Sequence, residues 1–240
     1  MDKYAIITGI SGDIGIKIAE TLDKTGYSII GGYHNNKESI QKLQNTLHNT
    51  CYFFKYDFSD PTSADKFIDE VTNLGVNVEI LINNAGISKV GMLQDLTVED
   101  WEAMWHVNVT SALFMSKGAI PLFLKGGTGH IINISSVWGE RGASCEVGYS
   151  ATKGALNAFT KALAKELAPS NIQVNALSLG YINTKMNAHL SDTEVQEIVD
   201  EIPAGRIGTC EDVADAVVGL INAGKYITGQ IIGIDGGWQI

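Results

Sequence analysis

The feature that most constrains the fold is a regular alternation of short apolar runs with longer segments of helical spacing. Seven runs have the length of β-strands and are almost continuously apolar, which is typical of parallel strands buried on both faces. These runs are residues 4–8, 28–33, 51–56, 78–83, 130–135, 173–176 and 230–234. Helix-like segments lie between them, among them residues 13–25, 62–74, 98–117 and 148–167. The alternation predicts right-handed crossovers and an α/β fold, a doubly wound parallel sheet of about seven strands with helices on both faces.

The chain organisation predicts one domain. A length of 240 residues fits a single core, and no repeat, low-complexity tract or linker divides residues 1–240. The segment 184–208 reads as a helical excursion between the sixth and seventh strands. Because ligands of such sheets bind beyond the carboxyl ends of the strands, we interpret this segment as a lid.

Composition and charge exclude several classes of partner. No window approaches about 18 uncharged apolar residues, so no membrane span is predicted. The chain runs from Met1 directly into a strand-like segment, which leaves no room for a signal peptide. A net charge of −10 argues against nucleic acid and anionic membranes as partners. These observations favour a cytoplasmic protein.

The cysteines and histidines give no sign of a metal site. Three cysteines are an odd, scattered set that suits a reducing compartment: Cys51, Cys145 and Cys210. Three of the histidines stand alone without zinc-ligand spacing: His106, His130 and His189. We therefore predict no bound metal.

A cluster of glycines follows the first strand-like run and precedes an amphipathic helix. Glycine lets the backbone approach a pyrophosphate, and a helix amino-terminus offers free N–H groups and partial positive charge. The alternative is a tight turn without a ligand. The position after the first strand favours a dinucleotide site, with these predicted contacts: Gly9, Ser11, Asp13, Ile14 and Gly15.

Polar residues also follow the third and fourth strands. In a parallel sheet these positions share the edge where a dinucleotide would rest. The predicted cofactor contacts there are Asp57, Phe58, Asn84, Ala85 and Gly86. The alternative is structural, with Asn83 and Asn84 satisfying turn backbone groups and Asp57 capping a helix.

Tyr149 and Lys153 carry the strongest chemical signal. A spacing of four residues puts both side chains on one helical face. A free phenol has a pKa of about 10, and a neighbouring ammonium favours the phenolate. Ser136 ends the fifth strand, so its hydroxyl is expected at the same edge, where it can bond a substrate carbonyl. This arrangement predicts acid–base chemistry by Tyr149.

Across essentially its whole length the chain resembles a classical short-chain dehydrogenase/reductase of Rossmann type. The glycine turn, Asn83-Asn84-Ala85-Gly86, Asn108, Ser136 and the Tyr149/Lys153 pair all fall in the order of that family. The resemblance implies a catalytic tetrad of Asn108, Ser136, Tyr149 and Lys153. Tyr149 would be the general acid in reduction, Ser136 would orient the carbonyl, Lys153 would bind the nicotinamide ribose, and Asn108 would hold a water in the proton relay.

The resemblance also implies contacts after the sixth strand, from Gly180, Ile182 and Thr184. Two residues depart from the family pattern. Asp13 replaces the middle glycine of the turn, where it can cap the following helix but would bring negative charge beside a pyrophosphate. Leu179 stands where the family usually has proline, which predicts a less rigid loop.

The end of the second strand favours NADP(H) over NAD. NAD-dependent enzymes place an acid there to accept hydrogen bonds from the ribose hydroxyls. Here the strand is followed by His34, Asn35, Asn36 and Lys37, with no acid before Glu38. A 2′-phosphate would meet no repulsion, and we predict His34, Asn35 and Asn36 among its contacts.

The closing segments 202–206 and 226–237 resemble 3-oxoacyl-[acyl-carrier-protein] reductases, which implies a carrier-bound or small ketone as substrate. The stretches before the fifth and sixth strands carry only Lys125 as a cation, a weak attraction for an acidic carrier protein. Residues 135–147 resemble instead a reductase of a 5-aminopentanone group on elongation factor P, and Glu140 or Glu146 would suit its amine. A third reading is a catalytically silent dinucleotide sensor or scaffold.

A homotetramer is the predicted assembly. The segments 98–117 and 148–167 carry apolar positions beyond one stripe, and the family resemblance implies two-fold interfaces. Residues on the second segment that would pack against another subunit, with the alanines allowing close approach, are Ala151, Ala155, Ala158, Phe159 and Ala162.

Overall fold

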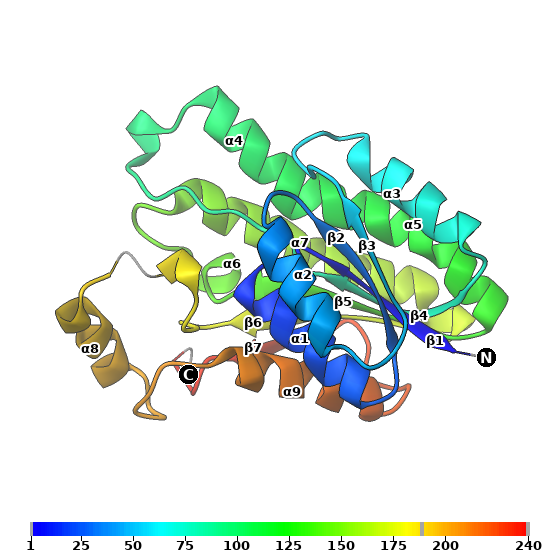
Figure 1. Cartoon of the computed structure of the whole chain (residues 1–240). Helices are drawn as coiled ribbons and strands as arrows, with labels where there is room; N and C mark the ends of the chain where they lie inside the picture. Colours follow the sequence, from blue (N-terminus) through cyan, green and yellow to red (C-terminus); the bar gives the residue numbers. More distant parts are fainter. Residues whose placement is uncertain (1, 188–189, 239–240) are drawn as a thin grey trace.

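A single parallel β-sheet organises the computed structural model, which describes residues 2–187 and 190–238 (Figure 1). Its seven strands lie in the order β3-β2-β1-β4-β5-β6-β7, and every pairing between them is parallel. The strands are β1 Lys3–Thr8, β2 Ser28–Tyr33, β3 Cys51–Lys55, β4 Asn77–Asn83, β5 Gly129–Ser136, β6 Ile172–Leu179 and β7 Ile231–Ile234. The predicted doubly wound, Rossmann-type α/β fold is confirmed.

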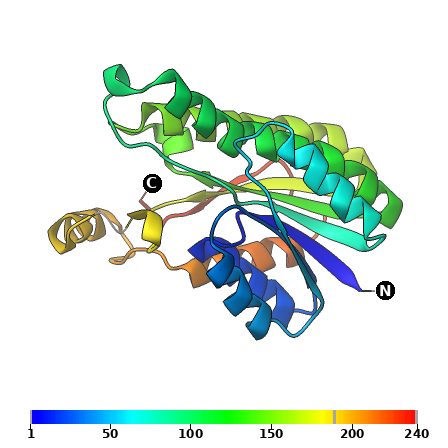
Figure 2. The same ribbon diagram turned by 45° about the horizontal axis from the view of Figure 1, so that its top comes forward.

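Helices cover both faces of this sheet, as Figure 2 shows. One layer contains α1 Asp13–Lys24, α2 Lys37–Thr46 and α9 Cys210–Asn222. The other contains α3 Ser63–Asn73, α4 Val98–Trp105, α5 Ser111–Gly126 and α7 Val147–Leu167. The remaining helical elements are α6 Trp138–Arg141, α8 Asp192–Glu201, the 3-10 turns η1 Leu93–Asp95, η3 Ala168–Ser170 and η4 Lys185–Asn187, and the π-helical turn η2 His106–Thr110.

The two helical layers explain why the strands are continuously apolar. Successive residues of a strand point to opposite faces, so Ala5 and Ile7 join one core cluster while Tyr4 and Ile6 join the other. Each strand must therefore be apolar at every position that a helix covers. The same logic extends β6, where all eight residues are buried, beyond the predicted 173–176.

The longest helical run differs from the sequence prediction. Residues 98–117 were expected as one helix, but the run continues to Gly126 through the π-helical turn at 106–110 and past Pro121. By length and composition, Val98–Gly126 is long and apolar enough to span a membrane, although charged residues such as Glu102 and Lys117 interrupt it and leave no window of about 18 uncharged residues. Met115, Ala119 and Phe123 nevertheless pack into the core, and core helices of soluble proteins meet the same criterion.

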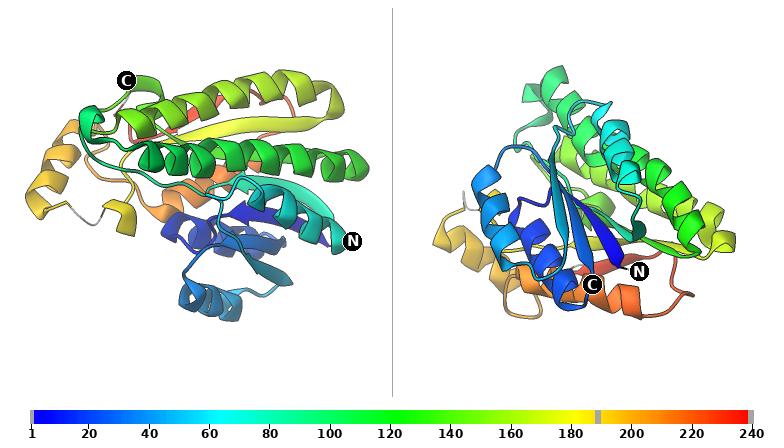
Figure 3. Two further views of the ribbon diagram at one scale, coloured as in Figure 1. Left: turned by 90° about the horizontal axis from the view of Figure 1, so that it is seen from above. Right: turned by 45° about the vertical axis from the view of Figure 1, so that its right-hand side comes forward.

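The sheet topology fixes the place of a ligand site. From β1 the chain winds outward to β2 and β3, returns to β4, and then proceeds to β7, so the order reverses between β1 and β4. A crevice opens at the carboxyl ends of strands where the order reverses. The segment 184–208, predicted as a lid, contains η4 and α8, and α8 projects from the body of the molecule (Figure 3). No residue of α8 is fully buried.

Candidate active site

A cavity of about 920 Å³ lies at the carboxyl ends of the strands, within the usual range for ligand pockets. Most residues that the sequence predicted for the site line it. They are Gly9, Ser11, Asp13, Ile14, Gly15, His34, Asn36, Asp57, Phe58, Asn84, Ala85, Gly86, Ser136, Tyr149, Lys153, Gly180, Ile182 and Thr184. Two predicted residues are not part of the lining, Asn35 and Asn108. Asn35 is exposed beyond the end of β2, and Asn108 is buried behind the pocket wall.

The glycine turn has room for backbone only. Gly9 has a φ of +63°, and a Cβ at Gly9 would lie 2.8 Å from the Cα of Ala85. A Cβ at Gly15 would lie 2.6 Å from the carbonyl oxygen of Gly9. Gly12 is the N-cap of α1, and no side chain caps this end. The turn thus leaves helix N–H groups open beside the cavity, a fit for the diphosphate of a dinucleotide.

Asn84 stabilises this turn. Its Nδ2 donates to the carbonyl oxygens of Thr8 at 3.0 Å and Gly9 at 3.1 Å. The Asn83 amide instead points into the core, where Nδ2 donates to Asn133 Oδ1 at 2.8 Å. The structural interpretation therefore holds for Asn84, which satisfies backbone groups of the turn and also lines the cavity, but it was wrong for Asn83, whose amide bonds groups in the core.

The region beyond β2 brings an imidazole next to a carboxylate. His34 Nε2 lies 3.3 Å from Asp57 Oδ2, and both residues line the cavity. Hydrogen bonding from the Ser59 backbone N–H holds the pKa of Asp57 below its usual range. Asp57 does not cap α3, because Thr62 is the N-cap there. Asn36 caps α2 by accepting from Ser39 N at 3.1 Å.

Lys153 is buried, with 4% of its surface exposed, and projects from α7 toward β5. Its Nζ donates to the carbonyl oxygen of Ile134 at 2.8 Å and lies 5.5 Å from the ring centroid of Tyr149. Burial lowers the pKa of Lys153 to about 8. With a pKa of about 8, the Lys153 ammonium can lose its proton close to neutral pH.

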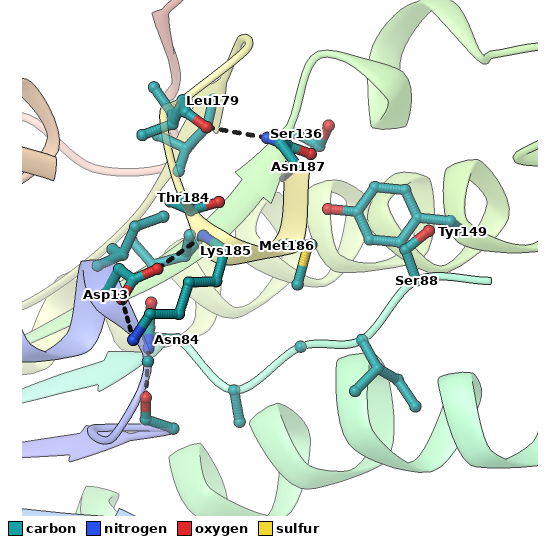
Figure 4. Close-up of a pocket in the computed structure, with 18 of the residues that line it drawn as sticks. Asp13, Asn84, Ser88, Ser136, Tyr149, Leu179, Thr184, Lys185, Met186 and Asn187 are labelled. Carbon is teal, nitrogen blue, oxygen red and sulfur yellow. Dashed lines mark hydrogen bonds and ion pairs between the residues drawn. The ribbon is translucent and has the colours of Figure 1, made fainter. Parts of the chain in front are cut away.

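Tyr149 is held in its neutral form. Burial raises the pKa of Tyr149, and the Glu146 carboxylate raises it further, whereas a hydrogen bond with Ser136 lowers it. The sequence argument expected Lys153 to lower this pKa, but desolvation outweighs that effect here. A neutral phenol is the form that can donate a proton. Figure 4 shows the Tyr149 hydroxyl directed toward the part of the pocket where Ser136 lies.

Asn108 is placed by the π-helical turn behind the loop that follows β4. Its Oδ1 accepts from Ile87 N at 2.9 Å, and its Nδ2 donates to Ile87 O at 2.9 Å and Thr152 Oγ1 at 3.0 Å. An ideal Cβ on Gly86 would lie 3.5 Å from both Asn108 Oδ1 and Lys153 Nζ. The side chain of Asn108 thus ties this loop to α7 beside Lys153.

Asp13 connects the glycine turn to the lid. It is the first residue of α1 and makes no capping hydrogen bond, so the expectation that it caps this helix was wrong. Its Oδ2 accepts from Lys185 N at 2.8 Å, and its Oδ1 lies 3.5 Å from Lys185 Nζ (Figure 4). Sequence reasoning missed Lys185, because the two residues are 172 positions apart.

Other pocket residues come from segments that no local motif marks. Ser88 Oγ donates to Glu146 Oε1 at 2.6 Å, and both residues line the cavity. Trp238 lines the opposite part, with its ring 5.2 Å from that of Trp138. Its Nε1 donates to Glu201 Oε2 at 3.2 Å, at the end of α8. Trp238 therefore connects the pocket wall to the lid.

Metal ligation receives no support within residues 2–187 and 190–238. There, no group of three His, Cys, Asp or Glu side chains is placed to hold a metal ion. His189, one of the three histidines considered in the sequence, lies outside the described residues.

Comparison with known proteins identifies a family to which this chain is similar. A family model described as enoyl-(acyl carrier protein) reductase, of the short-chain alcohol dehydrogenase type, matches residues 9–239. The chain belongs to the short-chain dehydrogenase/reductase family. The uncharacterized oxidoreductase YmfI of Bacillus subtilis is 38% identical over 100% of both chains. The 3-oxoacyl-[acyl-carrier-protein] reductase FabG of Aquifex aeolicus is 36% identical over 98% of this chain and 96% of the relative.

Solved structures of this family have the same fold. A protein provisionally assigned as an NAD(P)-dependent gluconate 5-dehydrogenase from Beutenbergia cavernae, with bound NADP, is 30% identical. It superposes with a TM-score of 0.92 over 98% of this chain and 96% of that chain. A Serratia marcescens short-chain dehydrogenase/reductase mutant is 28% identical, with a TM-score of 0.92 over 99% and 98%. An oxidoreductase with a nicotinamide dinucleotide cofactor is thereby supported.

Proposed function

We propose that this protein reduces a ketone to a secondary alcohol with NADPH, and that the ketone is a 3-oxoacyl thioester on acyl carrier protein. The observation that carries the proposal is the meeting of Ser136, neutral Tyr149 and buried Lys153 at one wall of the pocket. The FabG relatives support the substrate class. The bound dinucleotide would supply the hydride that reduces the carbonyl carbon.

The side chains divide the remaining work. The Ser136 hydroxyl donates a hydrogen bond to the carbonyl oxygen and fixes its position. The Tyr149 phenol donates its proton to that oxygen as the carbon is reduced, so the alcohol forms without a free alkoxide. Lys153, when charged, stabilises the phenolate that remains on Tyr149 and offers N–H donors to the ribose. Asn108 keeps the loop at Ile87 and α7 together around this centre.

We place the 2′-phosphate of NADP(H) beside His34 and Asn36. Both line the cavity at the end of β2, and the acid nearest to them, Asp57, faces His34 at 3.3 Å. The imidazole of His34 and the side-chain amide of Asn36 can donate hydrogen bonds to a phosphate. The NADP-bound relative supports the same choice.

The proposed assembly is a homotetramer in the cytoplasm. The α7 surface predicted as an interface exposes Ala151, Ala158 and Ala162, with Ala155 and Phe159 half-buried. Leu113 of α5 is 40% exposed. Light scattering at micromolar concentration should give four times the chain mass of 25.8 kDa, and a monomeric mass would contradict this assembly.

A second substrate is favoured by one observation, an acid at the pocket wall. Glu146 lines the cavity next to Tyr149, whereas Glu140 is exposed outside the lining. A carboxylate there would bind an amine, such as the 5-aminopentanone group carried by elongation factor P. Of the two stretches where an acidic carrier would dock, the one before β5 carries the exposed cation Lys125. The reduction of a carrier-bound ketone should therefore depend only weakly on salt.

The test uses one enzyme preparation, both ketones and a salt series, with NADPH oxidation as the readout. Glu146→Gln should raise KM for the amino-ketone and leave KM for the acyl thioester unchanged, with Glu140→Gln as the matched control. A strong, salt-sensitive preference for the carrier-bound chain, with Glu146→Gln unaffected, would reject the amine substrate. Tight NADPH binding without turnover of any ketone would favour a catalytically silent sensor and contradict the proposed reduction.

A further inference from the structure

We propose that Lys185 neutralises Asp13, which allows this chain to keep a carboxylate in its glycine turn and still bind the diphosphate of a dinucleotide. Asp13 stands where the family pattern has a small, uncharged glycine. The inference concerns the affinity of the site for its cofactor, and it rests on the dinucleotide-dependent function proposed above.

The contact joins two segments of the cavity lining that are far apart in the sequence. Asp13 begins α1, directly after the N-cap Gly12, and Lys185 begins η4 in the predicted lid. Both residues line the cavity (Figure 4). The Asp13 carboxylate receives the backbone N–H of Lys185 at 2.8 Å and faces its ammonium at 3.5 Å. The ammonium is thus held beside the turn through both the backbone and the side chain of one residue.

The electrostatics explain why the ammonium is needed. A carboxylate in the first turn of α1 is stabilised by the helix dipole, but an anionic ligand uses the same helix end. Two negative charges a few ångströms apart repel by about 1 kcal/mol even at high dielectric, and by more where water is excluded. The Asp13 side chain is 27% exposed, so solvent screens it only partly. An uncompensated Asp13 would therefore weaken diphosphate binding.

The other cation near this turn is already engaged. Lys17, one helical turn after Asp13, lies 2.6 Å from Glu211 and 3.4 Å from Glu20. Among the ion pairs of residues 2–187 and 190–238, Lys185 is the cation that faces Asp13. Charge compensation at the turn is thus assigned to one side chain, which makes the idea open to a direct test.

The position of the lid does not depend on that charge. The Lys185 backbone N–H would still reach Asp13 in a variant without the ammonium. The 3-10 turn η4, which carries Lys185, is also held by two hydrogen bonds of Asn187. Its Nδ2 donates to Ile182 O at 2.9 Å, and its carbonyl oxygen accepts from the Tyr181 hydroxyl at 3.3 Å. A side-chain substitution at Lys185 therefore separates charge from placement.

The experiment is a double-mutant cycle with dissociation constants for NADPH, measured by quenching of tryptophan fluorescence at low ionic strength. We expect Lys185→Met to raise Kd about tenfold, because it leaves the Asp13 charge unpaired. Asp13→Asn alone should bind as tightly as the wild type or a few-fold more tightly. The double variant should return to within about twofold of the wild type, since both charges are then absent.

Controls separate this idea from a direct lysine–phosphate contact. Lys89→Met removes an equivalent surface cation, which pairs with Asp100 at 3.4 Å outside the cavity lining, and should leave Kd unchanged. Lys185→Arg should retain binding, and added salt should shrink the Lys185→Met effect. A double variant as weak as Lys185→Met would overturn the inference, as would unchanged binding in Lys185→Met. A wild-type chain that binds neither NADPH nor NADH would overturn the proposed cofactor along with it.

Discussion

The two walls of the pocket are built in different ways. On the β5 and α7 wall, Ser136, Tyr149 and Lys153 lie on rigid elements, and Lys153 is buried. On the opposite wall, Asp13 and Lys185 meet across 172 positions of sequence, and the Lys185 side chain is 82% exposed. The chemistry is thus set by local spacing on packed elements, whereas the cofactor wall depends on contacts between distant, solvated segments.

The rigidity of the first wall has a visible cause. Two hydrogen bonds join buried polar side chains of β5 and α7. Ser135 Oγ donates to Asn157 Oδ1 at 2.6 Å, and Asn133 Nδ2 donates to Thr160 Oγ1 at 2.8 Å, whereas Asn157 Nδ2 has no partner among the described residues. Buried polar networks of this kind specify one arrangement, because any other would leave unpaired groups in a low dielectric. Among the described residues of the lid, 184–187 and 190–208, no polar side chain is fully buried, and α8 has no fully buried residue.

The largest effect is expected from Lys153→Met, which attacks the rigid wall. Turnover should fall by about 10²–10⁴, because no cation then stabilises the Tyr149 phenolate. Stability should change in the opposite direction. The folded-state pKa of about 8 lies below the ordinary lysine value of 10.5, so the charged lysine disfavours the folded state at neutral pH by about 3 kcal/mol. Loss of the bond to Ile134 O offsets about 1 kcal/mol of that, leaving a net gain of about 2 kcal/mol.

The difference in stability between the wild type and Lys153→Met should depend on pH. Below pH 8 the penalty is constant, and between about pH 8 and 10.5 the unfolded chain binds more protons, so the wild type gains stability as pH rises. Urea denaturation at pH 7 and pH 9.5 should therefore show a gap between the two proteins that narrows at the higher pH. A variant that is less stable than the wild type at pH 7 would show that Lys153 contributes packing rather than strain.

A smaller effect is expected at the adenosine end of the cofactor wall. NADPH should be preferred over NADH by at least about tenfold in kcat/KM, because His34 and Asn36 can meet a 2′-phosphate there. Initial rates with the two cofactors and one ketone measure this ratio. A clear preference for NADH would mean that Asp57, rather than His34, reads the ribose.

The smallest effect is expected where the chain terminus meets the lid. Trp238→Ala removes a ring that packs edge to face against Trp138 and whose Nε1 bonds Glu201, so KM for the ketone should rise about three- to tenfold with kcat little changed. Glu201→Gln, which keeps a hydrogen-bond acceptor, serves as the matched control and should behave as the wild type. If kcat falls and KM does not change, Trp238 acts on the chemical step rather than on substrate binding, which would contradict its assignment to the pocket wall.

Sequence patterns were sufficient for features with a local or periodic cause. The apolar runs predict the strands because residues such as Ile6 and Ile7 are buried on opposite faces. The four-residue spacing of Tyr149 and Lys153 likewise predicts their meeting on one face of α7. Glycine positions predict the turn at Gly9 and Gly15, where neighbouring backbone leaves no room for a side chain.

The remainder depends on tertiary contacts that carry no local signal. The pKa of Tyr149 is raised mainly by desolvation, which residue spacing does not reveal. Lys185 and Trp238 reach the pocket only because the lid and the chain terminus fold back over it. Helix capping also differs from the sequence prediction. Asn36, predicted as a cofactor contact, caps α2, whereas Asp13, expected as a helix cap, binds the lid.

The central claim is that the Tyr149 phenol donates the proton to the substrate carbonyl. Tyr149→Phe tests it most directly, because the change removes the hydroxyl and keeps the ring over Lys153. We predict a fall in NADPH-dependent ketone reduction of about 10²–10⁴, with the Kd for NADPH within about twofold of the wild type. Near-normal turnover in this variant would contradict the assignment.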